Sequence, residues 1–473
     1  MSEFEKGADS GRYEPSRRNS LLLRFTINPT IIETVKRVEQ FMSAFKPVRG
    51  MRDFLPEEAK IMRYIESQAR KTAKLYGYKE IITPVVEPYE LVTAKVGEEV
   101  RLRMYAFEDL SGRKVALRPE FTASVARLMA TTLRNEPKPL RLFCVGSLYR
   151  YDEPQKGRFR EFWQSNFELM GSDKPEADAE ILLLTNYLMK SIGLKNYKFK
   201  VGHVGVLRGI LSQEGLAEDT QNQAMQRMDK KLYEEAIKIV REAGASEKGI
   251  QTLQKLVNLR GEDAAKVLED LMKAVGDYAE AVEAVKNLGE ILSIVAGASE
   301  GLNITVDAGF ARGLEYYTGM IFEVYVPELD IALAGGGRYN RLVELFGGEP
   351  TPAVGVAHGI DRMMLALQEQ KAEVNLREAP LVMIIPVNER LYTEALRIAE
   401  ILRTKNIPVE FEVMGRKVSK ALEDADRRGV DHVIIVGEKE LREKAVVLRD
   451  MRKKEQAIVK ISELPATLKL QVS

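Results

Sequence analysis

The sequence predicts an α+β core, in which an antiparallel sheet is flanked by helices, with a helical insertion and a C-terminal α/β domain. Strand-like runs and short turns alternate through residues 100–170, and this tight spacing favours antiparallel pairing because parallel strands need long crossovers. Residues 216–296 keep the 3.6-residue apolar period of helices. From residue 381, strand-like and helical runs alternate over about 90 residues, which favours a largely parallel sheet.

Five segments are expected along the chain. Residues 1–45 form a polar arm and then an amphipathic helix at "TIIETVKRVEQFM". Residues 46–200 hold the first part of the core, where Pro56 opens a helix, Gly77 ends it and the strand "KEIITPVVEP" follows. The later segments are a mostly helical insertion at 201–300, the second part of the core at 301–372 and the C-terminal domain at 381–473.

The composition excludes a globally basic or acidic protein. The 473 residues are 45% apolar and 30% charged, enough material for about two to four domains. Because 71 Lys and Arg nearly cancel 70 Asp and Glu, the net charge is only +1. Any nucleic-acid partner must therefore be bound by local basic patches.

Cysteine and histidine usage argues against disulfides and against a metal site made by the protein alone. Cys144 is the single cysteine, and His203, His358 and His432 are scattered along the chain. Apolar runs such as "APLVMIIPV" are shorter than the roughly 20 residues of a membrane span. Polar residues occupy the N-terminus where a secretory signal would be apolar. We therefore expect a cytoplasmic protein with no membrane association.

Arginines are the candidates for phosphate binding, because the chain has no GxxxxGK[ST] phosphate loop. A single strand arginine more often lies on a solvated face or protects a sheet edge. The candidates within or beside strand-like runs are Arg118, Arg150, Arg158, Arg160, Arg312, Arg338 and Arg362.

Two polar segments could contribute to one site. In "FWQSNFELMG", alternation puts Phe162, Gln164 and Asn166 on one face, and we expect a bulge or bend to bring Glu168 round to them. In "LRPEFTAS", Thr122 could simply cap the helix that follows.

Two further segments combine strand character with unusual residues. The run "FARGLEYYTGMIFEVY" is strand-like but carries one arginine and two adjacent tyrosines. A purely structural interpretation pairs Arg312 with Glu315 and places both tyrosines in the core. The glycines of "AGGGRYN" fit either a flexible turn or the close approach of a substrate to a strand.

These segments resemble the motifs of the class II aminoacyl-tRNA synthetases. "KEIITPVVEP" is similar to motif one, "RYDEPQKGRFREFWQ" to motif two and "GVAHGIDRMMLAL" to motif three. Within that class, "LRPEFT", "FARGLEYYTGMIFE" and "AGGGRYN" resemble the marks of the histidyl-tRNA synthetases. The motifs keep the family's order from about Lys46 to the C-terminus. The resemblance therefore implies a class II core and an anticodon-binding domain at residues 381–473.

The resemblance implies an enzyme, a histidine–tRNA ligase. The family forms histidyl-adenylate from ATP and L-histidine, releases pyrophosphate, and then transfers histidine to the 3′ end of tRNA(His). Mg2+ is implied because it accompanies ATP and neutralises the leaving pyrophosphate. The resemblance also implies a homodimer through the motif-one face and contact of Gln155 and Lys156 with the tRNA.

The ATP site follows from the same resemblance. Arg150 would hold the α-phosphate, while Arg158 and Arg362 would hold the outer phosphates, a task that suits guanidinium groups. Phe162 would stack on adenine. Asp152 stands on the adenine side where the family often has the longer Glu.

Recognition of histidine is implied at five matching positions. Glu120, Thr122 and Gln164 would meet the α-amino group, which needs acceptors. Glu168 and Tyr317 would grip the two ring nitrogens. Binding of a different amino acid would leave these buried groups without a hydrogen-bond partner, and the free-energy cost would be large enough for the site to reject that amino acid strongly.

The reacting end of the amino acid is implied to meet one arginine. Arg312 would reach the carboxylate and the α-phosphate, where charge develops during attack. Tyr316 and Tyr339 would line the histidine pocket. The implied catalytic set is Arg312, Arg150 and Glu120.

The sequence leaves three alternatives. A non-catalytic synthetase-like regulatory subunit of histidine biosynthesis would usually lack the C-terminal domain and lose active-site residues, and both are present here. A class II synthetase of the threonyl or prolyl kind is disfavoured by "RGLEYY" and by the lack of zinc-ligand spacing. A pure tRNA-binding module would have no use for the adenine and phosphate positions.

Overall fold

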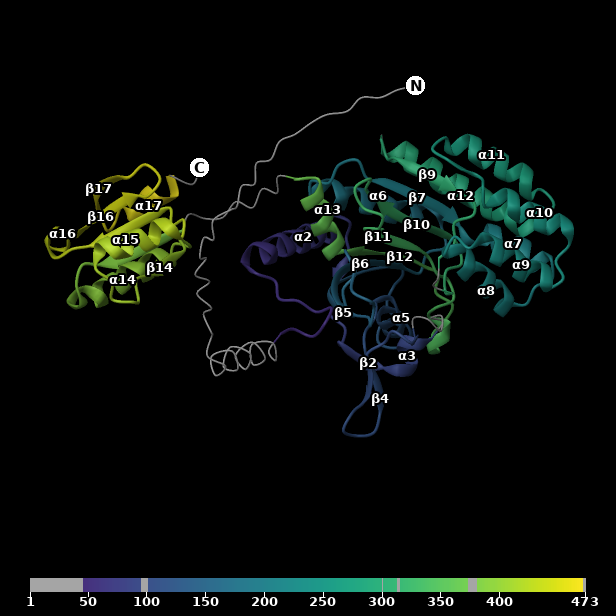
Figure 1. Cartoon of the computed structure of the whole chain (residues 1–473), viewed down its shortest axis with the longest axis horizontal. Coiled ribbons are helices and arrows are strands. Elements are labelled where there is room, and N and C mark those ends of the chain that lie inside the picture. The colour runs from purple at the N-terminus through teal and green to yellow at the C-terminus, as the bar shows by residue number, and fades with distance from the viewer. Residues whose placement is uncertain (1–45, 95–100, 300, 313–314, 373–380, 471–473) are drawn as a thin grey trace, which may run out of the picture. The chain divides into compact units, whose positions relative to one another are not determined.

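The computed structural model describes residues 46–94, 101–299, 301–312, 315–372 and 381–470 (Figure 1). The chain separates into two compact units, a larger one that ends at Ala372 and a smaller C-terminal one. The arm and helix expected over residues 1–45 lie outside the described residues.

In the first part of the larger unit, a helix begins and ends where its proline and glycine predict. Helix α2 (Pro56–Leu75) begins at the proline, carries Glu57 and Glu58 in its first turn, and is followed by Gly77 at a φ of +76°. The other elements in order are β1 (Lys79–Glu80), β2 (Val86–Pro88), α3 (Tyr89–Thr93), β3 (Ala106–Glu108), β4 (Lys114–Leu117), α5 (Thr122–Ala130), β5 (Leu140–Tyr149), β6 (Glu161–Met170) and α6 (Pro175–Ser191).

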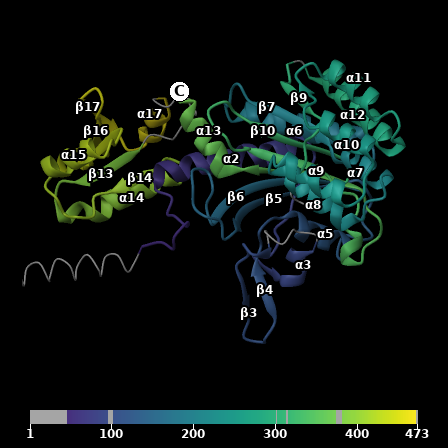
Figure 2. The same cartoon turned by 45° about the vertical axis from the view of Figure 1, so that its right-hand side comes forward.

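A mostly helical stretch comes next, between two strands of the same sheet. Its elements are β7 (Lys198–His203), α7 (Val204–Gln213), α8 (Glu218–Asp229), α9 (Tyr233–Glu242), α10 (Glu247–Leu256), β8 (Arg260–Gly261), α11 (Ala264–Val275) and α12 (Ala279–Ala298). The two-residue strand β8 interrupts the helices; it pairs with the following strand and so ties the helices to the sheet edge. Helices α7 to α12 gather at one side of the larger unit in both views (Figures 1 and 2).

The chain then returns to the sheet. The elements are β9 (Ile304–Asp307), β10 (Met320–Tyr325), β11 (Ala334–Arg338), the 3-10 turn η1 (Glu344–Phe346), β12 (Ala353–Gly359) and α13 (Ile360–Glu369). The strand character expected from Phe310 onward is wrong up to Gly319, because strand pairing with β7 and β11 starts only at Met320. The segment that carries Arg312, Tyr316 and Tyr317 is therefore a loop.

The nine-stranded sheet has the order β1-β5-β6-β12-β11-β10-β7-β9-β8. Pairing is antiparallel from β5 to β7, as expected, but parallel between β1 and β5 and between β7 and β9, so the sheet is mixed. Helices α2, α6 and α13 contact β6 or β12 from one face. On that face Phe167 packs against Tyr78 and Phe143, and His358 lies buried against Thr185 of α6. This apolar layer leaves the opposite face of β6 free for the site.

A separate small sheet, β2-β4-β3, projects from the larger unit (Figure 2). The C-terminal unit has its own five-stranded sheet of order β14-β13-β15-β16-β17. Its elements are β13 (Val382–Pro386), η2 (Glu389–Leu391), α14 (Tyr392–Arg403), β14 (Val409–Phe411), α15 (Val418–Arg427), β15 (His432–Val436), α16 (Glu438–Arg442), β16 (Ala445–Asp450), β17 (Glu455–Lys460) and α17 (Leu464–Leu470). Only the first three strands of the sheet are parallel, because β16 and β17 return as hairpin-like antiparallel partners.

A buried ion pair joins the end of β11 to helix α6. Arg338 donates from Nε and Nη2 to both carboxylate oxygens of Asp178, and the two side chains are 6% and 0% exposed. Arg338 also donates to the carbonyl of Ser172 at 2.8 Å. This arginine, a phosphate candidate from the sequence, is therefore structural.

We predict that Arg338→Met lowers the free energy of unfolding by about 3–5 kcal/mol, because it leaves Asp178 buried without a partner. Chemical denaturation of the purified variant measures the loss. The matched control is Arg134→Met, which breaks an exposed pair with Glu349 and should cost less than about 1 kcal/mol. Equal losses in the two variants would contradict the prediction.

Candidate functional site

A cavity of about 740 Å³ lies in the larger unit, over the sheet face opposite the helical layer. Many separated segments of the chain line it, from Arg103 to Arg362. The structure brings together thirteen of the residues singled out from the sequence, namely Glu120, Thr122, Arg150, Asp152, Arg158, Phe162, Gln164, Glu168, Arg312, Tyr316, Tyr317, Tyr339 and Arg362. Gln155 and Lys156 lie outside it, and Lys156 forms an exposed ion pair with Glu369 at 2.6 Å.

Strand β6 provides one wall of the cavity by simple alternation. Phe162, Gln164, Asn166 and Glu168 all line it, and the pairing of β6 with β5 runs without interruption from Glu161 to Met170. The bulge or bend expected from the sequence is therefore wrong. These four residues differ by multiples of two, so a regular strand already places them on one face.

Glu120 closes the start of helix α5. Its two carboxylate oxygens accept the backbone N–H groups of Thr122 at 2.8 Å and Ala123 at 2.7 Å. Burial raises the pKa of Glu120 in spite of these bonds. The helix cap considered for Thr122 is thus provided by Glu120, and the threonine hydroxyl instead donates to Glu168 at 2.8 Å.

Glu168 is the centre of a buried polar cluster. Besides the Thr122 hydroxyl, it accepts hydrogen bonds from the Tyr339 hydroxyl and from Asn166 Nδ2. Its side chain is almost fully inaccessible, and burial raises the pKa of Glu168 to about 7. The carboxyl group therefore changes its charge near neutral pH, and its donors orient it toward the cavity.

Six arginines line the cavity and give it positive charge, and four of them, Arg150, Arg158, Arg312 and Arg362, were singled out from the sequence. Arg150 donates from Nε to the carbonyl of Pro119 at 2.9 Å and lies 5.3 Å from the ring centre of Phe162. Arg362 donates to the carbonyls of Gly157 and Ala332 at 3.2 and 2.7 Å.

The charges of these arginines influence one another. Burial, and then the nearby charges of Arg150, Arg158 and Arg312, lower the pKa of Arg362 to about 10. It remains charged at neutral pH. Cations held this close together make the cavity suitable for a polyanion such as a nucleotide triphosphate.

Arg312 does not pair with Glu315, as the structural interpretation of its segment required. It donates to the carboxylate of Glu323 on β10, whereas Glu315 accepts a hydrogen bond from Gln226 of helix α8 at 3.0 Å. The rings of Tyr316 and Tyr317 lie 4.9 Å apart beside it. The loop between β9 and β10 thus brings an arginine and two aromatic walls into the cavity.

Two other arginines proposed from the sequence are structural. Arg118 is buried and donates to the backbone carbonyls of Thr83 and Ser147 at 2.7 and 3.1 Å. Arg160 is also buried and donates to the carbonyl of Asp152.

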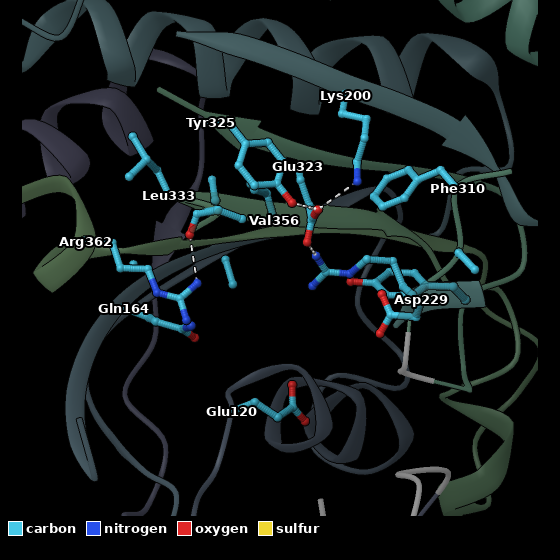
Figure 3. A pocket seen from close by; sticks show the side chains of 18 of the residues that line it. Glu120, Gln164, Lys200, Asp229, Phe310, Glu323, Tyr325, Leu333, Val356 and Arg362 are labelled. Carbon is cyan, nitrogen blue, oxygen red and sulfur yellow. Dashed lines mark hydrogen bonds and ion pairs between the residues drawn. The ribbon is translucent and has the colours of Figure 1, made fainter. Parts of the chain in front are cut away.

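Sequence reasoning missed several cavity residues. Lys200, Glu323 and Tyr325 come from strands β7 and β10, and their contacts depend on strand register (Figure 3). Gln226 and Asp229 come from helix α8, in the stretch interpreted as a mostly helical insertion. The signal that could have located Glu323 is its position two residues before Tyr325 in a strand, which puts both side chains on one face.

Two cavity oxygens lack a hydrogen-bond partner among the described residues. Oε1 of Gln164 and Oδ1 of Asn166 are buried and unpaired. Buried acceptors are usually satisfied, so these atoms indicate where a ligand donor, such as an ammonium or an imidazole N–H, would bind.

Comparison with known families separates the possibilities. A histidyl-tRNA synthetase model matches residues 50–363, which is more than half of the chain. The chain belongs to the histidyl-tRNA synthetase family. An anticodon binding domain model matches residues 381–471. The expected α+β core followed by a C-terminal α/β anticodon-binding domain is thereby confirmed.

Individual members of the histidyl-tRNA synthetase family agree over most of the chain. A histidine–tRNA ligase of Methanocaldococcus jannaschii is 42% identical over 89% of this chain and 98% of its own length. Histidyl-tRNA synthetase from S. aureus superposes with a TM-score of 0.63 at 27% identity, over 90% of this chain and 99% of that one. A Bacillus halodurans structure described as an ATP phosphoribosyltransferase regulatory subunit/histidyl-tRNA synthetase has a TM-score of 0.67 at 28% identity, covering 80% and 96%.

We predict that Glu168→Gln changes the pH dependence of stability. The pKa of Glu168 is about 7 in the folded protein against an ordinary 4.5. Below pH 4.5 the carboxyl is protonated in both the folded and the unfolded state. Between pH 4.5 and about 7 only the unfolded state loses the proton readily, so the folded state becomes less stable relative to the unfolded state. The free energy of unfolding of the wild type should therefore fall, relative to the variant, by up to about 3 kcal/mol between pH 4.5 and 7. Denaturation followed by fluorescence of Trp163, the single tryptophan, measures both proteins. Parallel curves would contradict this.

Proposed function

We propose that the chain is a histidine–tRNA ligase that forms histidyl-adenylate from histidine and ATP and then transfers histidine to the 3′ end of tRNA(His). The observation that carries this proposal is that one cavity holds Arg150, Arg158, Arg312 and Arg362, which suit phosphates, next to a buried Glu168 cluster that suits an amino acid. The family to which the chain belongs, and relatives named histidine–tRNA ligases, support the same activity.

ATP would bind along the arginines. Arg150 would contact the α-phosphate, with Arg158 and Arg362 at the outer phosphates, where guanidinium groups match phosphate oxygens. Phe162, which faces the cavity beside Arg150, would stack on adenine. Asp152, which accepts from Arg103 at 3.3 Å, would lie at the adenine side.

Mg2+ would enter with ATP as part of the substrate. The described residues contain no group of three or more His, Cys, Asp or Glu side chains arranged to hold a metal ion. Mg2+ is commonly bound through one or two carboxylates together with substrate phosphates and water, so such a group is not required.

Histidine would bind with its amino group toward Glu120, Thr122 and Gln164. Each carboxylate oxygen of Glu120 accepts one backbone N–H and keeps capacity for another donor. The unpaired Oε1 of Gln164 is a second acceptor. An ammonium group, with three donors, suits these acceptors.

The imidazole would lie between Glu168 and Tyr317, with Tyr316 and Tyr339 as walls. Tyr339 and Thr122 hold the Glu168 carboxyl in place, so it meets a ring N–H without first reorganising. An amino acid without that N–H would leave the buried carboxyl unpaired.

The first step would be an in-line displacement at the α-phosphorus. A carboxylate oxygen of histidine forms the new P–O bond while the bond to the β-phosphate oxygen breaks and pyrophosphate leaves. Arg312 would stabilise the charge that develops between carboxylate and phosphate. In the second step the terminal hydroxyl of the tRNA attacks the carbonyl carbon, and AMP leaves.

The tRNA and subunit contacts are also part of the proposal. The C-terminal unit would bind the anticodon, as its match to the anticodon binding domain model suggests, and exposed Gln155 and Lys156 would contact the acceptor end. A homodimer would cover the apolar side chains of Ile82, Leu102 and Leu110, which are exposed in the single chain.

The regulatory alternative is not favoured. The cavity retains residues with the chemistry for ATP and histidine, and the C-terminal domain is present. Helices of the described residues include none that is both long and apolar enough to cross a membrane. We propose a cytoplasmic location, consistent with the single buried cysteine.

The proposed function predicts histidine-dependent exchange of labelled pyrophosphate into ATP without tRNA. Among the twenty amino acids only histidine should support exchange, because it alone pairs with both ends of the pocket. Arg312→Ala should lower the exchange rate by about 100- to 1,000-fold, the typical loss for one charge-stabilising group.

The matched control for this experiment is Arg134→Ala, since Arg134 forms only an exposed ion pair with Glu349. Its exchange rate should equal that of the wild type. No exchange with any amino acid would favour the regulatory function, whereas exchange with a different amino acid would refute the histidine pocket.

A further inference from the structure

Three residues on neighbouring strands form one row beneath Arg312. Glu323 on β10 is directly opposite Lys200 on β7 and Gly335 on β11, both in antiparallel register. Residues directly opposite in antiparallel strands point to the same face. Tyr325 lies on that face as well, two positions along β10.

The carboxylate of Glu323 is held from three directions. One oxygen accepts from the Arg312 guanidinium, and the other accepts from the Tyr325 hydroxyl and lies 3.5 Å from Lys200 Nζ (Figure 3). Burial favours protonation of Glu323, but Arg312, Tyr325 and Lys200 together hold its pKa below the ordinary value. The group is therefore an anion with a fixed orientation, only 13% exposed.

Gly335 leaves the room that Arg312 occupies. A Cβ at this position would lie 2.8 Å from Nη1 and 3.0 Å from Nη2 of Arg312, so a side chain here would displace the guanidinium from its present place. The guanidinium thus rests on the bare backbone of β11. This close approach gives the middle of "AGGGRYN" a role in positioning an arginine.

From these contacts we infer that Glu323, fixed by Lys200 and Tyr325 and placed opposite Gly335, is a positioning residue that aims Arg312 at the reacting carboxylate and α-phosphate. The inference rests on the proposed function. A guanidinium has five N–H donors, so contact with Glu323 leaves others for the substrate. Arg312 lies close enough to Arg150 and Arg362 to affect their pKa values, and without Glu323 it would be repelled toward solvent.

The test is Glu323→Gln, assayed by histidine-dependent pyrophosphate exchange at varied histidine and ATP. We expect kcat to fall about 10- to 100-fold, as misplacement of a catalytic group does, with the KM for histidine nearly unchanged. In an Arg312→Gln background, single-turnover adenylate formation should respond to Glu323→Gln by less than about threefold, because the two residues act as one unit.

The matched control is Glu262→Gln, which removes a carboxylate that pairs with Lys198 of the same strand β7 at the surface, and its kcat should not change. If circular dichroism shows that Glu323→Gln does not fold, Tyr325→Phe is tested in its place. We expect this variant to lose less kcat than Glu323→Gln and to keep the KM for histidine. An unchanged kcat, or equal losses with and without Arg312, would overturn the inference while leaving the proposed function intact. Absence of exchange by the wild type would overturn both.

Discussion

The compensation of buried charge is the constraint on which this site depends. Arg312 lies close enough to Arg150 and Arg362 to lower the pKa of both, and each of the three is kept in place by an acceptor that the fold provides. Backbone carbonyls serve Arg150 and Arg362, while Arg312 has the carboxylate of Glu323. Cations held in advance by fixed acceptors need no reorganisation when an anion arrives. The free energy needed to bring these like charges together is therefore supplied when the protein folds, before any ligand binds.

The period of two along a strand allows one sheet to serve both stability and chemistry. On β6, Phe167 faces the helical layer and packs against Tyr78 and Phe143, while Gln164 and Glu168 face the cavity. A polar substitution on the face that packs against the helices would reduce packing. An apolar substitution on the face that lines the cavity would instead remove polar groups from the cavity. Packing of the apolar face supports the polar side chains on the opposite face of the same strand.

Most of the site could be predicted only through the resemblance to the histidyl-tRNA synthetases, whereas a smaller part follows local rules. The residues of β6 follow from alternation, and helix α2 from Pro56 and Gly77. The partner of Arg312 could not be predicted, because Glu323 reaches it only through the loop geometry between β9 and β10. Likewise, Lys200 meets Glu323 through register between strands more than 100 residues apart in the chain, for which a single sequence holds no signal.

The two functions of the cavity are supported by different parts of the fold. The Glu168 cluster is held by β6, the start of α5 and the end of β11, whereas Arg312 is held by β10 and the middle of β11. The tyrosines of the 316–317 loop lie between them, and Gln226 of α8 ties that loop to the helical stretch through Glu315. Movement of those helices would therefore disturb the arginine loop before it disturbed Glu168. Under the proposed function, selection of the amino acid and stabilisation of developing charge could vary independently, because the two groups share a sheet but not the contacts that fix them.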